Sequence, residues 1–320
     1  MVRTRFRAGT FAAMDGIPLS VPRMLDRAAA HGIVIRGDTA AVDETGWDFR
    51  VVHGTDTRGR RWILRSPRRA EVVGPAAVEA RLLRLLRARL PTRLPHWHVH
   101  EPEFIAYPRL PGSPAGTEDE RTLRYTWAID PCAGGADYPD ALARVLAALH
   151  AVPPQVATAA GVRHVPAARS REHAARQLDD ARAAFGLPAA RCRDWRRWLA
   201  DDDAWHADPV LVHGDVHPGH TLVARSADGG GRLTGLLDWT NARVDDPALD
   251  FVDQYYAGGP AVLDALLDAY RRHGGRVRPR MREHIVARAG FLWVHVSLLG
   301  LRTGRPHLTR TAVGRLRSTG

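Results

Sequence analysis

The chain has 320 residues, 45% of them hydrophobic, so we expect an extensive core in one large domain or two apposed domains. Its charge of +11 reflects 46 basic residues, all of them arginine. Because the chain has no lysine, a Walker A loop and a lysine Schiff base are excluded. The arginines are spread along the chain, which argues against a nucleic-acid partner. No stretch reaches the roughly 20 apolar residues of a membrane span, and no apolar secretory segment begins the chain, so we expect a soluble, cytoplasmic protein without a membrane partner. Cys132 and Cys192 lack the spacing of zinc or disulfide sites, so redox chemistry is not expected. We also expect a monomer.

The N-terminal part is predicted to be small and rich in strands. Apolar positions at helical spacing predict a helix over residues 18–32, which ends at a glycine. Two strands follow on either side of the turn TDTRGR, and the second of them ends near Arg65. Pro75 then opens the helix PAAVEARLLRLLRARLP, which Pro91 closes.

A Pro/Gly-rich link after the apolar strand in EFIAYPRLPGSP predicts the domain boundary. We expect an N-lobe of residues 1–107 and a C-lobe of residues 108–320. In the C-lobe one small β-hairpin is expected, formed by VLVHGD and TLVARSADGGGRLTGLLDW with its turn at SADGGG. The predicted fold class is α+β, with a β-rich N-lobe and a larger C-lobe in which helical patterns occupy residues 138–151, 169–186, 188–204 and, in several pieces, 248–303.

Glu79 is an acidic residue on the apolar side of the helix that Pro75 opens. It shares a helix face with the leucines three, four and seven residues further on. Left unpaired inside the protein, it would be destabilising by roughly 3–5 kcal/mol, so a nearby cation is expected. Arg65, at the end of the preceding apolar strand, is one possible partner. In the alternative, Glu79 reaches solvent and meets Arg84 or Arg87 on its own helix, and the residues alone favour neither.

Several polar residues lie at the ends of apolar strands in the C-lobe. Asp238 closes the strand GLLD, where the structural alternative is a cap on the next turn. Asp215 follows VLVHG, two residues after His213, and His220 comes five residues later. Because adjacent strands end at the same edge, we expect Asp215, His220 and Asp238 to form a site.

Zinc is one chemistry that the histidines of the loop at residues 213–220 suggest. His213, His217 and His220 have spacings of four and three, which would converge on a helix. The dipeptide Pro218-Gly219 prevents that helix, so a zinc site is disfavoured. In the plain structural alternative, His213 braces the loop through backbone contacts and His217 is solvated.

Phosphoryl transfer accounts for all the unusual polar residues. It requires a carboxylate that accepts the proton of a substrate hydroxyl, ligands for Mg²⁺, and a cation on the nucleotide phosphates that a buried acid holds in place. Asp215 is the candidate base, His220 and Asp238 are the candidate metal ligands, and Arg65 with Glu79 is the candidate cation with its anchor.

The order of these motifs resembles the aminoglycoside-phosphotransferase group within the protein-kinase-like fold. More particularly, HGDVHPGH followed by LLDWTNARVDDPALDF resembles the macrolide 2′-phosphotransferases. The stretches TRGRRWILRSPRR, IAYPRLPG and ALARVLAALHAVP are also similar to that family. The resemblance runs from about Asp43 to Asp253 and implies a two-lobed fold with a catalytic loop at 213–220 and a metal-bearing strand at 233–238.

The resemblance also implies a role for each residue of the catalytic region. Asp215 corresponds to the catalytic carboxylate, and His213 supports its loop. His220 takes the place of an asparagine in most of the wider group, a substitution that the macrolide kinases share. Asp238 corresponds to the aspartate of the kinase metal motif, and Arg65 stands where the wider fold has its lysine.

For the phosphoryl donor, the resemblance implies GTP more than ATP, bound with Mg²⁺. The expected nucleotide-binding residues are Arg65 and Glu79, together with a hinge whose backbone reads the purine: Ala106, Tyr107, Pro108 and Arg109. Two features depart from the family pattern. No glycine-rich phosphate loop is recognisable, since ETGWDFRV contains only Gly46, and Asn241 stands where the family more often has an acid.

The substrate expected from the resemblance is a macrolide, phosphorylated on the 2′-hydroxyl of its desosamine sugar. Aminoglycosides are polycations, but after Asp250 the chain has only four acids against twelve arginines. A macrolide needs an apolar wall and one or two carboxylates, and HIVARAGFLWVHVSLLGL is either that wall or an ordinary buried helix. The alternatives are a kinase of another hydroxylated small molecule, such as an aminoglycoside, and a nucleotide-binding pseudokinase, which the three site residues disfavour.

Overall fold

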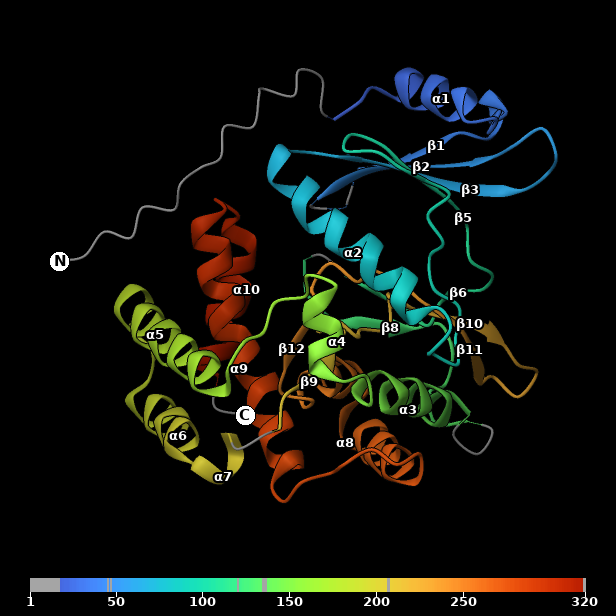
Figure 1. Cartoon of the computed structure of the whole chain (residues 1–320). Coiled ribbons are helices and arrows are strands. Elements are labelled where there is room, and N and C mark those ends of the chain that lie inside the picture. Colours follow the sequence, from blue (N-terminus) through green and yellow to red (C-terminus); the bar gives the residue numbers. More distant parts are fainter. Residues whose placement is uncertain are drawn as a thin grey trace. The chain divides into compact units, whose positions relative to one another are not determined.

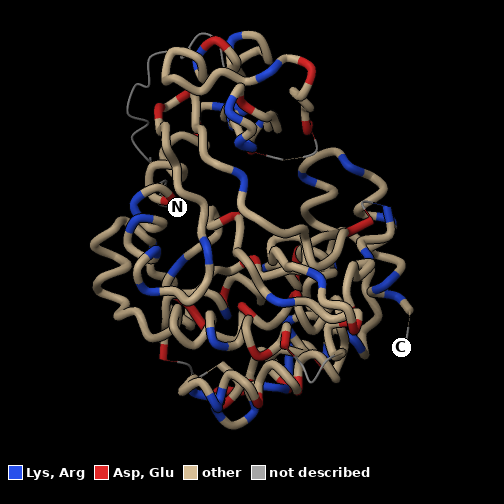
Figure 2. Tube along the Cα trace, turned by 90° about the vertical axis from the view of Figure 1, so that its right-hand side faces the viewer, with Lys and Arg blue, Asp and Glu red and all other residues tan. Residues whose placement is uncertain are grey.

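A computed structural model describes residues 18–44, 46, 48–119, 121–133, 137–205 and 208–318. The described residues form two compact units (Figure 1). Of the described residues, the first unit contains those up to Ala80 together with Pro95–Arg109, and the second contains Arg81–Leu94 and those from Leu110 onward. Basic and acidic positions are interleaved along the trace (Figure 2), as expected for solvated arginines. The first 17 residues, on which the expectation of no secretory segment rests, lie outside the described residues.

A five-stranded antiparallel sheet makes up most of the first unit, in the order β1-β2-β3-β5-β4. Helix α1 (Val21–Ala30) confirms the predicted N-terminal helix, and β2 and β3 confirm the two strands around the turn. A 3₁₀ turn (Gly37–Thr39) precedes the sheet and a second (Ala70–Val72) leads into α2. The strands are β1 (Ala41–Asp43), β2 (Phe49–Thr55), β3 (Arg61–Pro67), β4 (Val99–His100) and β5 (Ile105–Pro108).

The two faces of this sheet carry separate apolar clusters. Because side chains alternate along a strand, Trp62 and Leu64 of β3 join the cluster on the face that α1 covers, whereas Ile63 joins the cluster on the other face. Ala76 of helix α2 (Val73–Leu86) packs into that second cluster. Arg65, two residues after Ile63, therefore points toward the α2 side of the sheet.

Helix α2 ends one turn earlier than the sequence predicts. The expected helix runs to Pro91, but the structure has turns from residue 87 onward, with the Arg89 amide donating to the Leu86 carbonyl at 2.9 Å. Pro91 lacks the N–H that would bond to the carbonyl four residues earlier, and it disfavours helical geometry in the residue before it. The last turn therefore tightens and the helix stops at Leu86.

Most of the second unit is helical. Its helices are α3 (Asp137–His150), α4 (Pro154–Ala159), α5 (Ala167–Phe185), α6 (Ala189–Ala200), α7 (Asp202–Trp205), α8 (Leu249–Arg272), α9 (Met281–Arg302) and α10 (Pro306–Arg317). The predicted helical segments are confirmed, and α4 and α10 are additional. Helix α8 is kinked at Gly259, whose φ of 71° and ψ of −165° are open to glycine, and Pro260 follows it.

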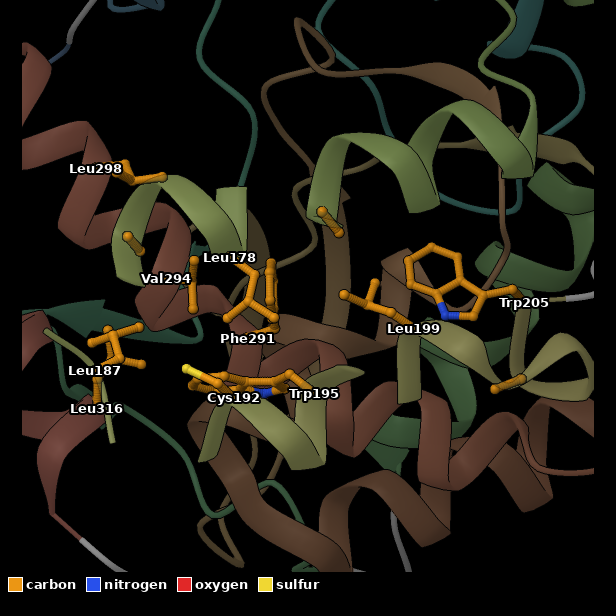
Figure 3. Close-up of a cluster of buried hydrophobic side chains, with 13 residues drawn as sticks. Leu178, Leu187, Cys192, Trp195, Leu199, Trp205, Phe291, Val294, Leu298 and Leu316 are labelled. Atoms are coloured by element: carbon orange, nitrogen blue, oxygen red, sulfur yellow. The ribbon is translucent and has the colours of Figure 1, made fainter. Parts of the chain in front are cut away.

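An apolar cluster joins α5, α6, α7, α9 and α10 (Figure 3). Trp195 of α6 packs edge-on against Phe291 of α9 with ring centroids 5.6 Å apart, and Val294 is fully buried beside them. Among the described helices, α9 is the one long and apolar enough by length and composition to span a membrane. Three of its apolar residues, Phe291, Val294 and Leu298, belong to this cluster, so one side of α9 packs inside the second unit.

Three small sheets complete the second unit. They are β11-β10-β6, β12-β9 and β7-β8, built from β6 (Ser113–Pro114), β7 (Gly116–Glu118), β8 (Tyr125–Trp127), β9 (Val210–Val212), β10 (Thr221–Arg225), β11 (Gly231–Leu236) and β12 (Arg243–Asp245). The predicted hairpin is confirmed for β10 and β11. Including β9 in the same β element was wrong, because β9 pairs with β12, a three-residue strand with two charged residues that apolar periodicity does not reveal.

Candidate active site

The loop at residues 213–220 connects β9 to β10 and has no helical turns, as Pro218 predicts. Gly214 turns the chain with φ of +79°. A Cβ at this position would lie 2.8 Å from the carbonyl oxygen of Asn241, so the loop can take this path only with glycine. The next residue, Asp215, is thereby directed away from the strand and keeps 30% of its side chain exposed.

His213 braces the loop from inside, which confirms the role predicted for it. Its ring is fully buried, its Nε2–H donates to the carbonyl of Leu237 at 2.9 Å, and it packs edge-on against Trp239 at 4.5 Å. Burial lowers the pKa of His213, so the ring is neutral with its lone pair on Nδ1. The contact ties the catalytic loop to the residue just before Asp238.

Asp250 is the main anchor of the loop, and sequence reasoning did not assign it to the site. The Asp250 carboxylate is fully buried and accepts hydrogen bonds from the amides of His213 (2.9 Å) and Gly214 (2.6 Å). It also accepts from Nε2 of His150 at 3.0 Å, whose Nδ1 meets the hydroxyl of Tyr270 at 2.7 Å. Three donors from two elements thus converge on one carboxylate and fix the backbone that carries Asp215.

Asp215 has the geometry of a proton acceptor. Its Oδ2 accepts a hydrogen bond from the side-chain amide of Asn241 at 3.1 Å. Among the described residues, Oδ1 makes no hydrogen bond, so it is available to a substrate hydroxyl. The asparagine that departs from the family pattern therefore contacts the candidate base directly and fixes the orientation of its carboxylate.

His220 and Asp238 face each other at the ends of the neighbouring strands β10 and β11, as predicted. The Nδ1–H of His220 donates to the carbonyl of Asp215 at 3.0 Å, so the lone pair lies on Nε2, which is 3.8 Å from Oδ2 of Asp238. The other oxygen of Asp238 accepts from the hydroxyl of Thr240 at 2.7 Å. Asp238 has a φ of +56°, a strained conformation for aspartate. The carboxylate oxygen of Asp238 is the type of ligand that Mg²⁺ takes, and Nε2 of His220 could be a further ligand of a divalent cation; both groups are held by outer hydrogen bonds.

His217 lies beside these residues, but among the described residues the three histidines considered for zinc do not form one group. Asp215, His217 and His220 have ligand atoms within 4.8 Å of one another. However, the rings of His217 and His220 stack at 3.7 Å, and Nδ1 of His217 accepts from the Gly219 amide at 3.0 Å. Burial lowers the pKa of His217 to about 3. His213, the third histidine of the zinc hypothesis, is not in this group, because its Nε2–H donates to the Leu237 carbonyl. The side chain of His217 is partly exposed.

The first unit contains the predicted pair of Arg65 and Glu79. Nη1 of Arg65 lies 3.6 Å from Oε1 of Glu79, and the side chains are 10% and 1% exposed. The guanidinium of Arg65 also lies 3.8 Å from the centroid of the Phe49 ring. Pairing with Arg65 is therefore confirmed, and the alternative in which Glu79 reaches solvent was wrong. The guanidinium of Arg65 is thus held in place by a buried carboxylate, as expected of a cation that would bind phosphate.

Replacing Glu79 with glutamine is expected to lower the free energy of unfolding by about 3–5 kcal/mol, since the charged Arg65 stays buried after its counter-charge is removed. Urea unfolding of the purified protein measures the change. Glu172→Gln is the matched control, because Glu172 pairs with Arg176 on the exposed surface of α5 and is expected to contribute no more than about 0.5 kcal/mol. Equal effects of the two substitutions would contradict a stabilising role for the buried pair.

The predicted hinge residues end the first unit. Ala106, Tyr107 and Pro108 pair with β3, and the amide of Arg109 donates to the carbonyl of Arg61 at 2.9 Å. Strand β4 pairs only with Ile105 and Ala106, so Tyr107 and Pro108 of β5 extend beyond β4. Purine binding by this segment stays a prediction.

The residues that sequence reasoning missed lie at the start of α8. Besides Asp250, they include Gln254, whose Nε2 donates to the carbonyl of Val216 at 3.0 Å and whose Oε1 accepts from Tyr138. The available signal was the polar stretch DDPALDFVDQ at the beginning of an otherwise apolar helix. Asp250 and Gln254 are four residues apart, hence on one helix face, and that face holds the first half of the catalytic loop.

Comparison with known proteins agrees with this geometry. The model of the phosphotransferase enzyme family (APH) matches residues 39–284. The crystal structure of the macrolide 2′-phosphotransferase MphH from Brachybacterium faecium has 36% identity and a TM-score of 0.80, with 94% of this chain and 99% of MphH covered. A macrolide 2′-phosphotransferase type I has 36% identity and a TM-score of 0.81, with 93% and 97% covered.

A further relative, YcbJ of Bacillus subtilis (strain 168), is described as an uncharacterized protein. It is 36% identical over 283 residues, which are 88% of this chain and 91% of YcbJ. More distant structures share the fold, among them an aminoglycoside phosphotransferase with GDP and kanamycin at 20% identity and one with ADP at 14%. The expected protein-kinase-like fold, an antiparallel N-terminal sheet followed by a mainly helical part, is confirmed. The chain belongs to the phosphotransferase enzyme family.

Proposed function

We propose that the protein transfers the γ-phosphoryl group of GTP or ATP to the 2′-hydroxyl of the desosamine sugar of a macrolide and so inactivates the antibiotic. The observation that carries the proposal is the group formed by Asp215, His220 and Asp238, in which a carboxylate oxygen is available beside a nitrogen and a carboxylate that suit a cation. The 36% identity to two macrolide 2′-phosphotransferases over nearly the whole chain supports the substrate class.

In the proposed reaction, Oδ1 of Asp215 accepts the proton of the substrate hydroxyl as that oxygen bonds to the γ-phosphorus. The bond between the γ-phosphorus and the oxygen bridging to the β-phosphate breaks, and the nucleoside diphosphate leaves with that electron pair. Asn241 holds Oδ2, so the carboxylate cannot rotate away from the hydroxyl. Bound Mg²⁺ would neutralise the phosphate oxygens, and Nε2 of His220 and a carboxylate oxygen of Asp238 would hold it.

The remaining assignments follow the same chemistry. Arg65, fixed by Glu79, would contact the nucleotide phosphates, and the backbone of residues 106–109 would contact the purine. GTP is proposed over ATP by analogy with the macrolide kinases. The protein is proposed to act as a monomer in the cytoplasm, without a nucleic-acid or membrane partner.

The substrate assignment is tested by incubating the purified protein with Mg²⁺, GTP or ATP, and either erythromycin or kanamycin. Mass spectrometry is expected to detect one added phosphate on erythromycin, and fragmentation is expected to place it on the desosamine sugar. Transfer to kanamycin with erythromycin unchanged would instead support the second candidate, a kinase of another hydroxylated small molecule. That candidate is disfavoured because residues 251–320 contain four acids and twelve arginines, a poor composition for binding a polycation.

A further inference from the structure

Asp253 is an acidic side chain beside the catalytic loop that the proposed reaction does not use. It lies one turn after Asp250 on α8, partly exposed, and it is close enough to Asp215, Asp250 and Glu118 to interact with their charges. Among the described residues it forms no hydrogen bond and no ion pair. The neighbours that act on its charge are therefore acidic. The arginines of this region act further along, where Arg315 and Arg124 influence Tyr256.

A row of aromatic rings leads outward from the catalytic loop past this carboxylate. His217 lies 5.6 Å from Tyr125 between ring centroids, Tyr125 lies 6.1 Å from Tyr256, and Tyr256 lies 5.7 Å from Trp293. The four rings come from four different elements: the loop, β8, α8 and α9. All four are partly exposed, and the hydroxyl of Tyr256 donates to the carbonyl of Leu123, which fixes that ring in place.

Tyr125 connects the rings with the acids. It is paired across the β7-β8 ladder with Glu118, so the two side chains emerge on the same face. Burial raises the pKa of Tyr125, and the charges of Glu118, Asp253 and Asp215 raise it further. The phenol therefore stays neutral and offers a ring face surrounded by carboxylates.

Carboxylate charge beside exposed aromatic faces is the chemistry that recognises an alkylammonium ion. The ring faces attract the N-methyl groups and the positive charge, while the carboxylate supplies the full counter-charge. Burial and the neighbouring acids also raise the pKa of Asp253 to about 8, a cost that a bound cation would remove. In desosamine the dimethylammonium stands on the carbon next to the reacting hydroxyl, so a group that binds the amine also positions the hydroxyl.

We propose that Asp253, with the ring faces of Tyr125 and Tyr256, binds the tertiary ammonium of the sugar that accepts the phosphate, and thereby determines substrate specificity. This inference rests on the proposed function. Asp253 and Asp215 then have separate roles, because one holds the cation and the other accepts the proton of the neighbouring hydroxyl. A sugar without the ammonium group is expected to bind with its hydroxyl poorly aligned with the Asp215 carboxylate.

The test compares kcat/KM for erythromycin with kcat/KM for its N-oxide, in which the amine carries no net charge, using GTP and Mg²⁺. The wild-type protein is expected to prefer the amine by at least about 10-fold, equivalent to about 1.4 kcal/mol. Asp253→Asn is expected to reduce this preference to less than about 3-fold, mainly by slowing the amine. Asp268→Asn, which removes the same charge from an exposed position on the same helix, is expected to keep the wild-type preference.

The outcomes separate the two levels of the proposal. Transfer to macrolides with an unchanged amine preference in Asp253→Asn, or an equal loss for both substrates, would overturn the role of Asp253 and leave the proposed function standing. No transfer to any macrolide by the wild-type protein would refute both. If Asp253→Asn does not fold, Tyr125→Leu is used instead, and it is expected to reduce the amine preference because it removes the central ring.

Discussion

Replacement of Asp215 with alanine is expected to lower kcat by about 10²–10⁴-fold, the usual contribution of a positioned general base. The reason is that the substrate hydroxyl loses its proton acceptor, the carboxylate that Asn241 holds in place. Nucleotide affinity is expected to change little, since Asp215 is not assigned to the phosphates or the cation. Steady-state phosphorylation of erythromycin measures the first effect, and titration with a fluorescent GTP analogue measures the second.

Asp179→Ala is the matched control, because this exposed aspartate on α5 contributes only a surface ion pair with Arg196. It is expected to retain the wild-type kcat. A near-normal rate in Asp215→Ala would mean that another group accepts the proton. Loss of nucleotide binding in the same variant would instead indicate that Asp215 contributes to the cation site.

Replacement of Asp250 with asparagine is expected to lower the free energy of unfolding by about 3–5 kcal/mol. The carboxylate accepts from three donors, and an asparagine side chain would direct its NH₂ group at one of them. The loop would lose its anchor, so phosphorylation of macrolide is expected to fall along with stability. Urea unfolding at neutral pH and steady-state kinetics on the folded fraction measure the two effects.

The pH dependence of this effect has a definite sign. Burial alone would raise the pKa of Asp250, but hydrogen bonds from His150 and from the Gly214 amide outweigh it and hold the pKa below the usual 3.8. Asp250 therefore contributes its full stability above the unfolded-state pKa and loses it as the pH falls through the folded value. The difference between wild type and Asp250→Asn is expected to be constant near neutral pH and to shrink below about pH 4. A difference that grows on acidification would contradict this.

The spacing of apolar residues and the positions of proline and glycine in the sequence located most helices and strands correctly. The alternation in β2, the continuous buried run in β3 and the 3.6-residue spacing in α1, α3 and α5 are local patterns that burial imposes on consecutive residues. Proline and glycine likewise act locally, so Pro218 correctly excluded a helix in the catalytic loop. Elements with weak local signals were missed, such as β12 with its two charged residues and the short helix α4.

The candidate site was predicted in part for the same reason. Asp215, His220 and Asp238 lie at the ends of apolar strands, and Glu79 lies on an apolar helix face, so each was conspicuous in its own segment. For Glu79, however, sequence could not choose between Arg65 and the arginines of its own helix. Only the packing of α2 on the sheet decided in favour of Arg65.

By itself, then, the sequence determined which residues are polar where polarity is costly, along with the order of strands and helices around them. Tertiary structure alone decided which distant groups meet. His150 binds the carboxylate of Asp250, 100 residues further along the chain, and the ring of Tyr256 contacts the rings of Tyr125 and Trp293. The physical reason is that burial and backbone geometry select a periodic pattern of apolar residues within one helix or strand. A hydrogen bond or ring contact between separate elements depends on how those elements pack, and it produces no periodic pattern in the sequence.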